Sequence, residues 1–170
     1  ELGLLTAPSV TAAPTPSVTE HQPLVRTVRK LRGDRRHGGY VHKARITEIV
    51  SLSNARGGMA EGVRHMTLFY YYGACHSWHA CDCPGSGMAH EWAFAKTVEL
   101  NATFNPPLGC EEVLSAVRRF DVPKEHKRWR ANTIAKALQV SPVEAEALAL
   151  SAIAPDSVQK CRKEHAQALA

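Results

Sequence analysis

The chain has 170 residues, of which 44% are hydrophobic, and its 21 Lys and Arg against 16 Asp and Glu give a formal charge of +5. This length and composition are typical of a soluble globular protein with one ordinary domain or two small ones. No apolar run reaches the ~20 residues of a transmembrane helix, and the start lacks the charged and apolar regions of a secretory signal. We therefore expect a cytoplasmic protein with no membrane partner. Because the chain begins with Glu1 rather than Met, we expect a processed chain or part of a longer one.

The N-terminal region divides into two predicted parts. Residues 1–23 are predicted to be a disordered leader or linker, because four prolines stand among Thr, Ser and Ala with little to bury. Residues 24–39 are predicted to be a basic arm, either a short helix or a segment that stays mobile until it meets a partner. Gly38-Gly39 is expected to break this segment. From Arg26 to Arg45 the chain has eight basic residues and one acid, Asp34.

Residues 40–122 are predicted to form a helical bundle. Apolar residues recur every three or four positions in the ranges 40–55, 59–76 and 90–104, which predicts three amphipathic helices. Gly57-Gly58 is expected to end the first helix and residues 81–87 to form a loop after the second.

Pro106-Pro107 is expected to stop the third of these helices, because proline has no amide hydrogen and restricts the residue before it. A fourth helix is predicted to open near Gly109, with Glu111 and Glu112 placed favourably against the helix dipole. No segment alternates like a strand, so the sequence predicts an all-α fold.

Residues 123–170 are predicted to hold a helix-turn-helix-like segment and a basic tail. Gln139-Val140 is expected to form the turn, and Ser141 to cap a helix that begins at Pro142. That second helix carries Glu144 and Glu146, which would repel phosphates, and it offers no side chain suited to base edges at its start. A packing role for this helix is therefore favoured over base recognition.

A cluster of cysteines and histidines raises the question of a metal site. Six potential ligands fall within sixteen residues, and the candidate zinc ligands among them are Cys75, His79, Cys81 and Cys83. However, Cys-x-Cys is not a usual zinc spacing, and no second Cys-x-x-Cys follows. We expect ordinary loop or core residues here, with no metal and no other cofactor. The odd total of five cysteines fits a reducing cytoplasm.

Catalytic motifs are absent from the sequence. It contains no phosphate-binding glycine loop, no dinucleotide fingerprint, no nucleophile elbow and no His-Glu-x-x-His. A Cys-His nucleophile pair such as Cys75 with His79 would lack a third orienting group, and the four aspartates are isolated. If the whole molecule polymerises or cleaves nucleic acid, we expect the active site outside this chain.

Clustered cations indicate a polyanion partner. Lys124-Glu125-His126-Lys127-Arg128-Trp129-Arg130 places an aromatic ring among cations, as expected where phosphates are neutralised and an unpaired base is stacked. The alternatives are a solvated basic surface and a core position for Trp129. The predicted DNA-binding residues are Arg64, Arg118, Arg119, Lys124, Lys127, Arg128, Trp129 and Arg130, with Arg29, Lys30 and Arg32 of the arm.

Three short motifs carry a family resemblance: Glu61-Gly62-x-Arg64-His65-x-x-Leu68-Phe69, Asn101-x-x-Phe104-x-Pro106-Pro107-Leu108 and Glu112-Val113. They resemble the primase C-terminal helical domain of plasmid and mobile-element replication proteins, in which Asn often stands at the position of His65. The segment from Arg128 to Glu144 is similar to the helical segment that follows this domain. The resemblance covers about 43–166.

The resemblance implies a helical module that engages origin or template DNA beside a separate polymerase domain, whose metal-binding aspartates do not map onto this chain. The sequence thus predicts a DNA-binding module of a replication initiator or primase-like protein, with DNA and a catalytic primase domain or helicase as partners. Two alternatives stay open, a helix-turn-helix transcriptional regulator and a non-catalytic protein-interaction domain.

Overall fold

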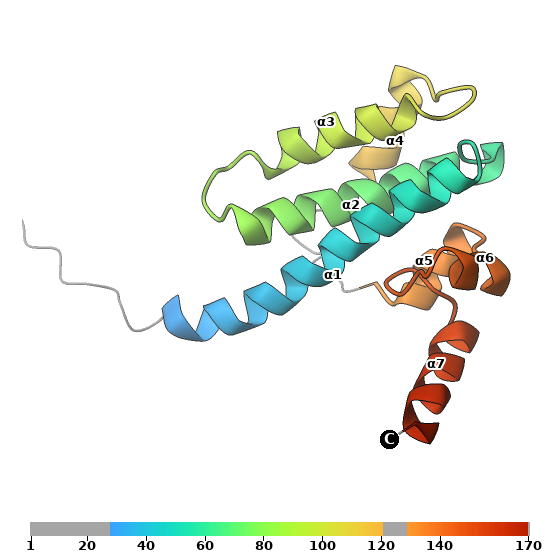
Figure 1. The fold of residues 1–170 in the computed structure, drawn as a ribbon. Helices are drawn as coiled ribbons and strands as arrows, with labels where there is room; N and C mark the ends of the chain where they lie inside the picture. Colours follow the sequence, from blue (N-terminus) through green and yellow to red (C-terminus); the bar gives the residue numbers. More distant parts are fainter. Residues whose placement is uncertain (1–27, 121–128, 170) are drawn as a thin grey trace, which may run out of the picture.

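The computed structural model describes residues 28–120 and 129–169, with side chains from residue 39 onward. Within these ranges the chain forms seven α-helices and no strand, which confirms the predicted all-α fold (Figure 1). None of the described helices combines the length and the apolar character needed to cross a bilayer. The predicted leader, 1–23, lies outside the described residues, as do 24–27 of the arm.

The longest helix is α1, Val28–Ala55, and it corrects the predicted break at Gly38-Gly39. Glycine lowers helix stability by about 1 kcal/mol per residue, which is not enough to end a helix that tertiary contacts support. Farther along α1, Ile49 and Leu52 are fully buried in the core. The helix therefore continues through the predicted boundary between arm and bundle.

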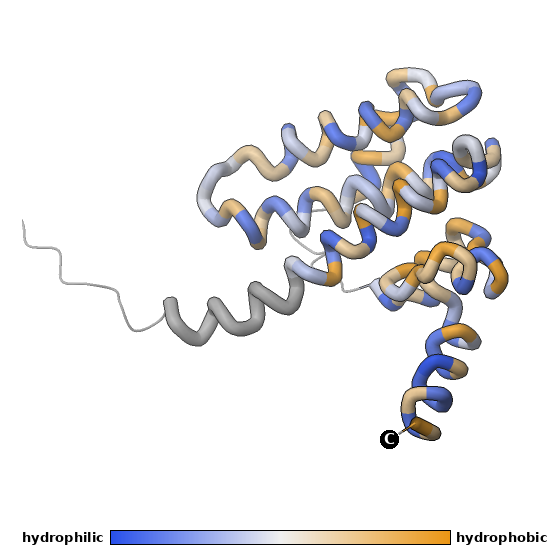
Figure 2. Tube along the Cα trace, in the orientation of Figure 1, coloured by the Kyte–Doolittle hydropathy of each residue, from blue (hydrophilic) through white to orange (hydrophobic). Residues whose placement is uncertain are grey.

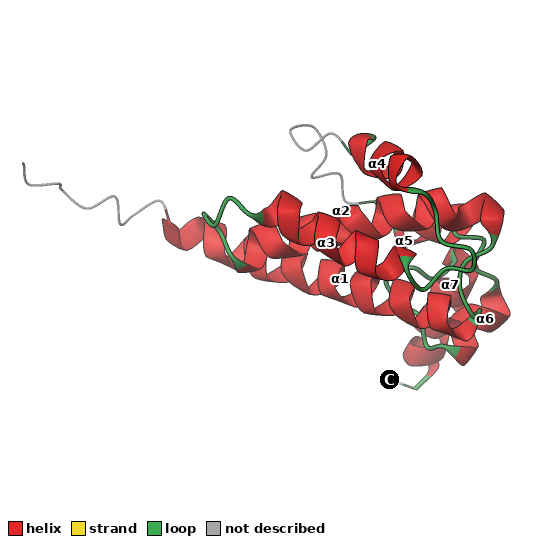
Figure 3. Cartoon of the chain, turned by 90° about the horizontal axis from the view of Figure 1, so that it is seen from above, coloured by secondary structure: helices red, strands yellow, loops and turns green. Residues whose placement is uncertain are grey.

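Three further helices complete the bundle: α2, Arg64–Asp82, which follows a 3-10 turn at Glu61–Val63, then α3, Ala89–Asn101, and α4, Cys110–Arg118. Helix α2 lies between α1 and α3 (Figure 1) and also packs against α4, which is seen most clearly from above (Figure 3). Leu68 and Tyr72 on α2 are among the most deeply buried side chains.

Two helix ends differ from the prediction. Helix α2 includes Cys81 and Asp82, so the predicted loop begins only at Cys83. It extends this far because Trp78 packs on Trp92 of α3, with ring centroids 5.0 Å apart. Helix α3 ends at Asn101, whose side-chain amide accepts from the Leu108 amide and donates to its carbonyl, both at 2.9 Å, and so closes the Pro106-Pro107 corner.

The C-terminal unit consists of α5, Ala131–Ala137, α6, Pro142–Ala147, and α7, Asp156–Ala168. The predicted cap is confirmed: the Glu144 amide donates to Ser141 Oγ at 3.2 Å, and Glu144 Oε2 accepts from the Ser141 amide at 3.0 Å. Helix α7 is largely hydrophilic (Figure 2) and buries only Val158.

Helices α5 and α6 end in the same way. The Val140 amide donates to the Ala135 carbonyl and the Leu150 amide to the Ala145 carbonyl, both at 2.8 Å. In each case the residue before the donating amide has a left-handed backbone conformation, with φ 53° at Gln139 and φ 52° at Ala149. This geometry satisfies the last carbonyls of a helix and normally selects glycine. A ten-residue sequence repeat, Ala-x-Ala-Leu-x-(Val/Leu)-Ser, underlies the two ends.

Two charged residues, Glu48 of α1 and Arg56 directly after its end, hold the C-terminal unit against the bundle. The guanidinium of Arg56 forms two bonds to the Glu144 carboxylate, at 2.7 and 2.9 Å, and also donates to the carbonyls of Leu138 and Gln139. Two turns earlier, the Glu48 carboxylate accepts from the amides of the segment 151–153 at 2.9 to 3.0 Å. The unit is thus fixed to α1 at both of its turns.

Candidate nucleic-acid interface

An aromatic cluster joins the bundle to the start of the C-terminal unit. The ring of Trp129 lies 5.3 Å from Phe69, 5.0 Å from Tyr70 and 5.9 Å from Phe120, measured between centroids. Edge-to-face contacts at these distances add about 0.5–1.5 kcal/mol each beyond the burial of apolar area. The cluster therefore holds Phe120 and Trp129 together, although eight residues separate them in sequence.

The rings of Trp129 and Phe120 pack directly against the backbone of α2 at Gly73. A Cβ atom at Gly73 would lie 2.7 Å from Cζ3 of Trp129 and 2.8 Å from Cε2 of Phe120, closer than carbon atoms approach in proteins. The absence of a side chain on this turn of α2 is thus what lets both rings pack directly on the helix.

The cluster brings together three of the predicted phosphate-binding residues. Arg118 and Arg119 directly precede Phe120, and Arg130 directly follows Trp129, so the contact between the two rings brings together the chain segments that carry these cations. We call Arg118, Arg119 and Arg130 the cationic strip. All three are exposed, and none of them takes part in an ion pair that the described residues form. Lys124, Lys127 and Arg128 lie outside the described residues.

The prediction for Arg64 is wrong. This side chain is 7% exposed, with its Nε donating to the Met59 carbonyl and one terminal nitrogen to the Asn105 carbonyl, both at 2.9 Å. The guanidinium ties the start of α2 to the corner after α3, where it is out of reach of a DNA backbone. Arg64 is therefore a structural residue.

Trp129 takes the core position that the sequence left as an alternative. It is half-buried in the aromatic cluster, and its carbonyl accepts a bond from the Arg45 guanidinium. A ring held on four sides in this way is not free to stack on a base. Of the arm residues, Arg29, Lys30 and Arg32 lie on the first turns of α1, where side chains are not described.

The helix-turn-helix-like segment does not present a reading helix. Helix α6 has six residues, and its partly exposed acid, Glu144, is neutralised by Arg56, which directly follows α1. The hydrogen bonds and the adjacent guanidinium lower the pKa of Glu144 from 4.5 to about 2. The exposed side chains of α6 include Val143 and Glu146, neither of which can donate to a base edge. The geometry supports the packing role.

The cysteine-histidine cluster does not converge on a metal position. Cys75 is fully buried, and burial raises the pKa of its thiol to about 12, which opposes the thiolate that zinc requires. His79 packs its ring on Trp92, while Cys81 is half-buried and Cys83 exposed beyond the end of α2. No group of three potential ligands comes together among the described residues.

The sequence analysis missed the roles of Arg45, Glu48 and Arg56. Only the spacing of Arg45 and Glu48, three positions apart on one face of α1, hints at a shared role, and Arg56 directly follows that helix. Each finds its partner more than 80 residues away. No protein-family model, curated protein or solved structure matches this chain.

Proposed function

We propose that this chain is a helical DNA-binding module of a plasmid-type replication initiator or primase-like protein. The observation that carries the proposal is the cationic strip, since its three arginines are exposed, form no ion pair among the described residues, and flank the two rings of one aromatic contact. Phosphate contacts of this kind give affinity and orientation rather than sequence specificity. The family resemblance of the motifs in 61–113 supplies the replication context.

The exposed arginines of the cationic strip determine how the module contacts DNA. In the described part of the chain the scaffold presents guanidinium groups, and α6 offers no donor to a base edge, so the module engages origin or template DNA through the phosphate backbone. A catalytic primase domain or a helicase is the partner that the family resemblance implies. Five cysteines without disulfide partners favour a reducing cytoplasm as its location.

The test is a comparison of two charge reversals with the same change in net charge. Arg118→Glu, Arg119→Glu and Arg130→Glu together remove the cationic strip, whereas Lys96→Glu, Lys160→Glu and Lys163→Glu reverse exposed or half-exposed lysines of α3 and α7. Binding to fluorescent single- and double-stranded 20-mers is measured by anisotropy between 50 and 200 mM KCl.

Three phosphate contacts correspond to a salt slope of about −2.7, so their loss should remove about a 40-fold salt effect over this range. The strip variant should bind at least about 100-fold more weakly at 50 mM salt. Equal weakening by both variants would mean that net charge alone acts and would refute the strip. Wild-type protein that binds neither oligonucleotide would refute the DNA-binding function in favour of a protein-interaction domain.

A further inference from the structure

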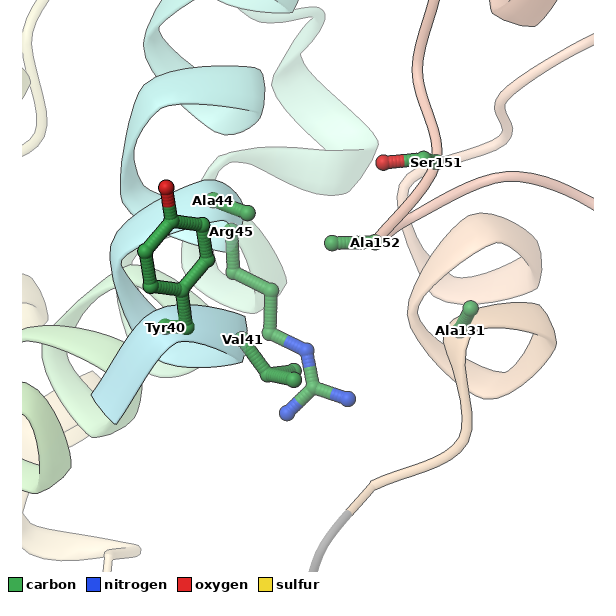
Figure 4. A pocket seen from close by; sticks show the side chains of 7 residues that line it. All are labelled: Tyr40, Val41, Ala44, Arg45, Ala131, Ser151 and Ala152. Atoms are coloured by element: carbon green, nitrogen blue, oxygen red, sulfur yellow. The ribbon is translucent and has the colours of Figure 1, made fainter. Parts of the chain in front are cut away.

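Arg45 is a buried cation with unused donors. Its side chain is 5% exposed, and its guanidinium points into the space between α1 and the C-terminal unit (Figure 4). One terminal nitrogen donates to the Trp129 carbonyl, while Nε and Nη1 have no hydrogen-bond partner among the described residues. Burying an unpaired charge costs several kcal/mol, so such a group is normally compensated by an anion.

The nearest carboxylate does not fill this role. Glu48 lies one turn along α1, but its two oxygens accept from the Ser151 hydroxyl at 2.8 Å and from three successive backbone amides. Burial lowers the pKa of Arg45, and Glu48 opposes this only as the smaller influence. An arginine remains charged under such conditions, so the site keeps a positive charge.

An open pocket of about 360 Å³ lies beside this guanidinium. Tyr40, Val41, Ala44 and Arg45 of α1 form one wall, and Ala131, Ser151 and Ala152 of the C-terminal unit form the other (Figure 4). The alanine and serine side chains of the two walls are too small to fill this volume. The side chain of Tyr40 lies at the opening of the pocket and is 81% exposed. The volume falls within the range of about 300–1,000 Å³ typical of ligand sites.

We propose that this pocket binds a phosphate group, with Arg45 as the charge partner and Tyr40 placed against the nucleoside that carries the phosphate. The planar fork of a guanidinium matches phosphate oxygens, and an exposed aromatic ring offers a stacking surface to any base. The phosphate is that of a free nucleotide or of a nucleic-acid strand. The pocket adjoins the cationic strip, since Arg45 donates to the carbonyl of Trp129 and Ala131 directly follows Arg130, but it is built from different side chains.

Chemical shifts of the full chain, including the Arg45 Nε–H resonance, test this directly. Titrations with inorganic phosphate and with thymidine monophosphate, at constant ionic strength, should shift Arg45 and the amides of Ser151 and Ala152 saturably. Thymidine and acetate should not. The nucleotide should bind at least about fivefold more tightly than inorganic phosphate, corresponding to about 1 kcal/mol of stacking, and Tyr40→Ala should abolish that difference.

Arg45→Met should also abolish the phosphate response. If that variant does not fold, a matched pair of substitutions at Ala152 still tests the proposal. Ala152→Glu places a carboxylate in the pocket and should abolish the phosphate response, whereas Ala152→Gln, of the same size, should retain it. No saturable shift with either phosphate ligand, an equal response to acetate, or a phosphate response that survives Ala152→Glu would overturn the proposal.

Oligonucleotides identify the source of the phosphate. If 5′-hydroxyl and 5′-phosphate 10-mers both shift Arg45, the pocket accepts backbone phosphates; if only the 5′-phosphate form does, it accepts terminal ones, and either result supports the site. Phosphate binding at Arg45 without salt-dependent oligonucleotide binding would leave the pocket standing and refute the proposed DNA function. Oligonucleotide binding without a phosphate response at Arg45 would refute the phosphate pocket and leave the proposed DNA function standing.

Discussion

The ion pair between Arg56 and Glu144 should make the stability of this protein depend on pH in a predictable way. Glu144→Gln removes the negative charge but keeps an oxygen that can accept from the Ser141 amide, so it isolates the contribution of the charge. The fall in the pKa of Glu144 from 4.5 to about 2 corresponds to about 3 kcal/mol of native-state stabilisation. About a third of this side chain is exposed, and solvent screening reduces the expected effect to roughly 1 kcal/mol.

The sign follows from the depressed pKa. Above pH 4.5 the carboxylate is ionised in both the folded and the unfolded chain, and its full contribution is present. As the pH falls toward 2, the unfolded chain takes up the proton first, so the contribution is progressively lost. The free-energy difference between wild type and Glu144→Gln should therefore be about 1 kcal/mol at pH 7, fall to roughly half by pH 3, and vanish near pH 2.

Urea unfolding followed by circular dichroism, at pH 7, 5, 4 and 3, measures this difference. Glu99→Gln is the control, because Glu99 pairs with Lys96 at 2.6 Å on the exposed surface of α3 and should change stability by less than about 0.5 kcal/mol. A difference between wild type and Glu144→Gln that is the same at pH 3 as at pH 7 would contradict this reasoning. So would equal effects of the two substitutions.

Two further substitutions probe backbone and packing features. Gly73→Ala should destabilise the protein by about 1–3 kcal/mol, because its Cβ has no room beside Trp129 and Phe120, and it should weaken DNA binding by displacing Arg130. Gly62→Ala, whose Cβ would meet nothing within 4 Å, is the control in urea unfolding, and equal effects would contradict the packing argument. Gln139→Gly should raise Tm by about 2 °C, since glycine tolerates φ 53° better than glutamine does. Lys136→Gly, inside α5, should lower Tm, and a lower Tm for Gln139→Gly as well would show that the turn is not strained.

Local sequence signals predicted the helices well. Apolar spacing gave the central parts of α1 to α3, and the Ser141-Pro142 pair gave the start of α6, because both depend on interactions within a few residues. The errors fall where distant contacts decide the outcome. Gly38-Gly39 stays helical within α1, and α2 reaches Asp82 because Trp78 meets Trp92.

The candidate site was less predictable, for the same physical reason. A cation in a helical motif can face solvent, as Arg118 does, or fold back onto carbonyls, as Arg64 does, and spacing does not distinguish the two. The acid of α6 seemed to repel phosphates, but its partner, Arg56, lies 88 positions earlier in the chain. Charge patterns alone therefore could not distinguish the exposed cations from those that bind carbonyls of the chain itself.

The attachment of the C-terminal unit to α1 also has a mechanical consequence. Glu48 lies on α1 and Arg56 is the first residue after its end, so the two are eight residues apart, or about 12 Å along the helix axis. Because the C-terminal unit is held at two points spaced along the helix axis, it must rotate together with α1 and cannot rotate about either contact alone. The same helix projects beyond the rest of the bundle at its N-terminal end (Figure 1). A force applied to the N-terminal end of α1 would therefore be transmitted to both C-terminal turns together.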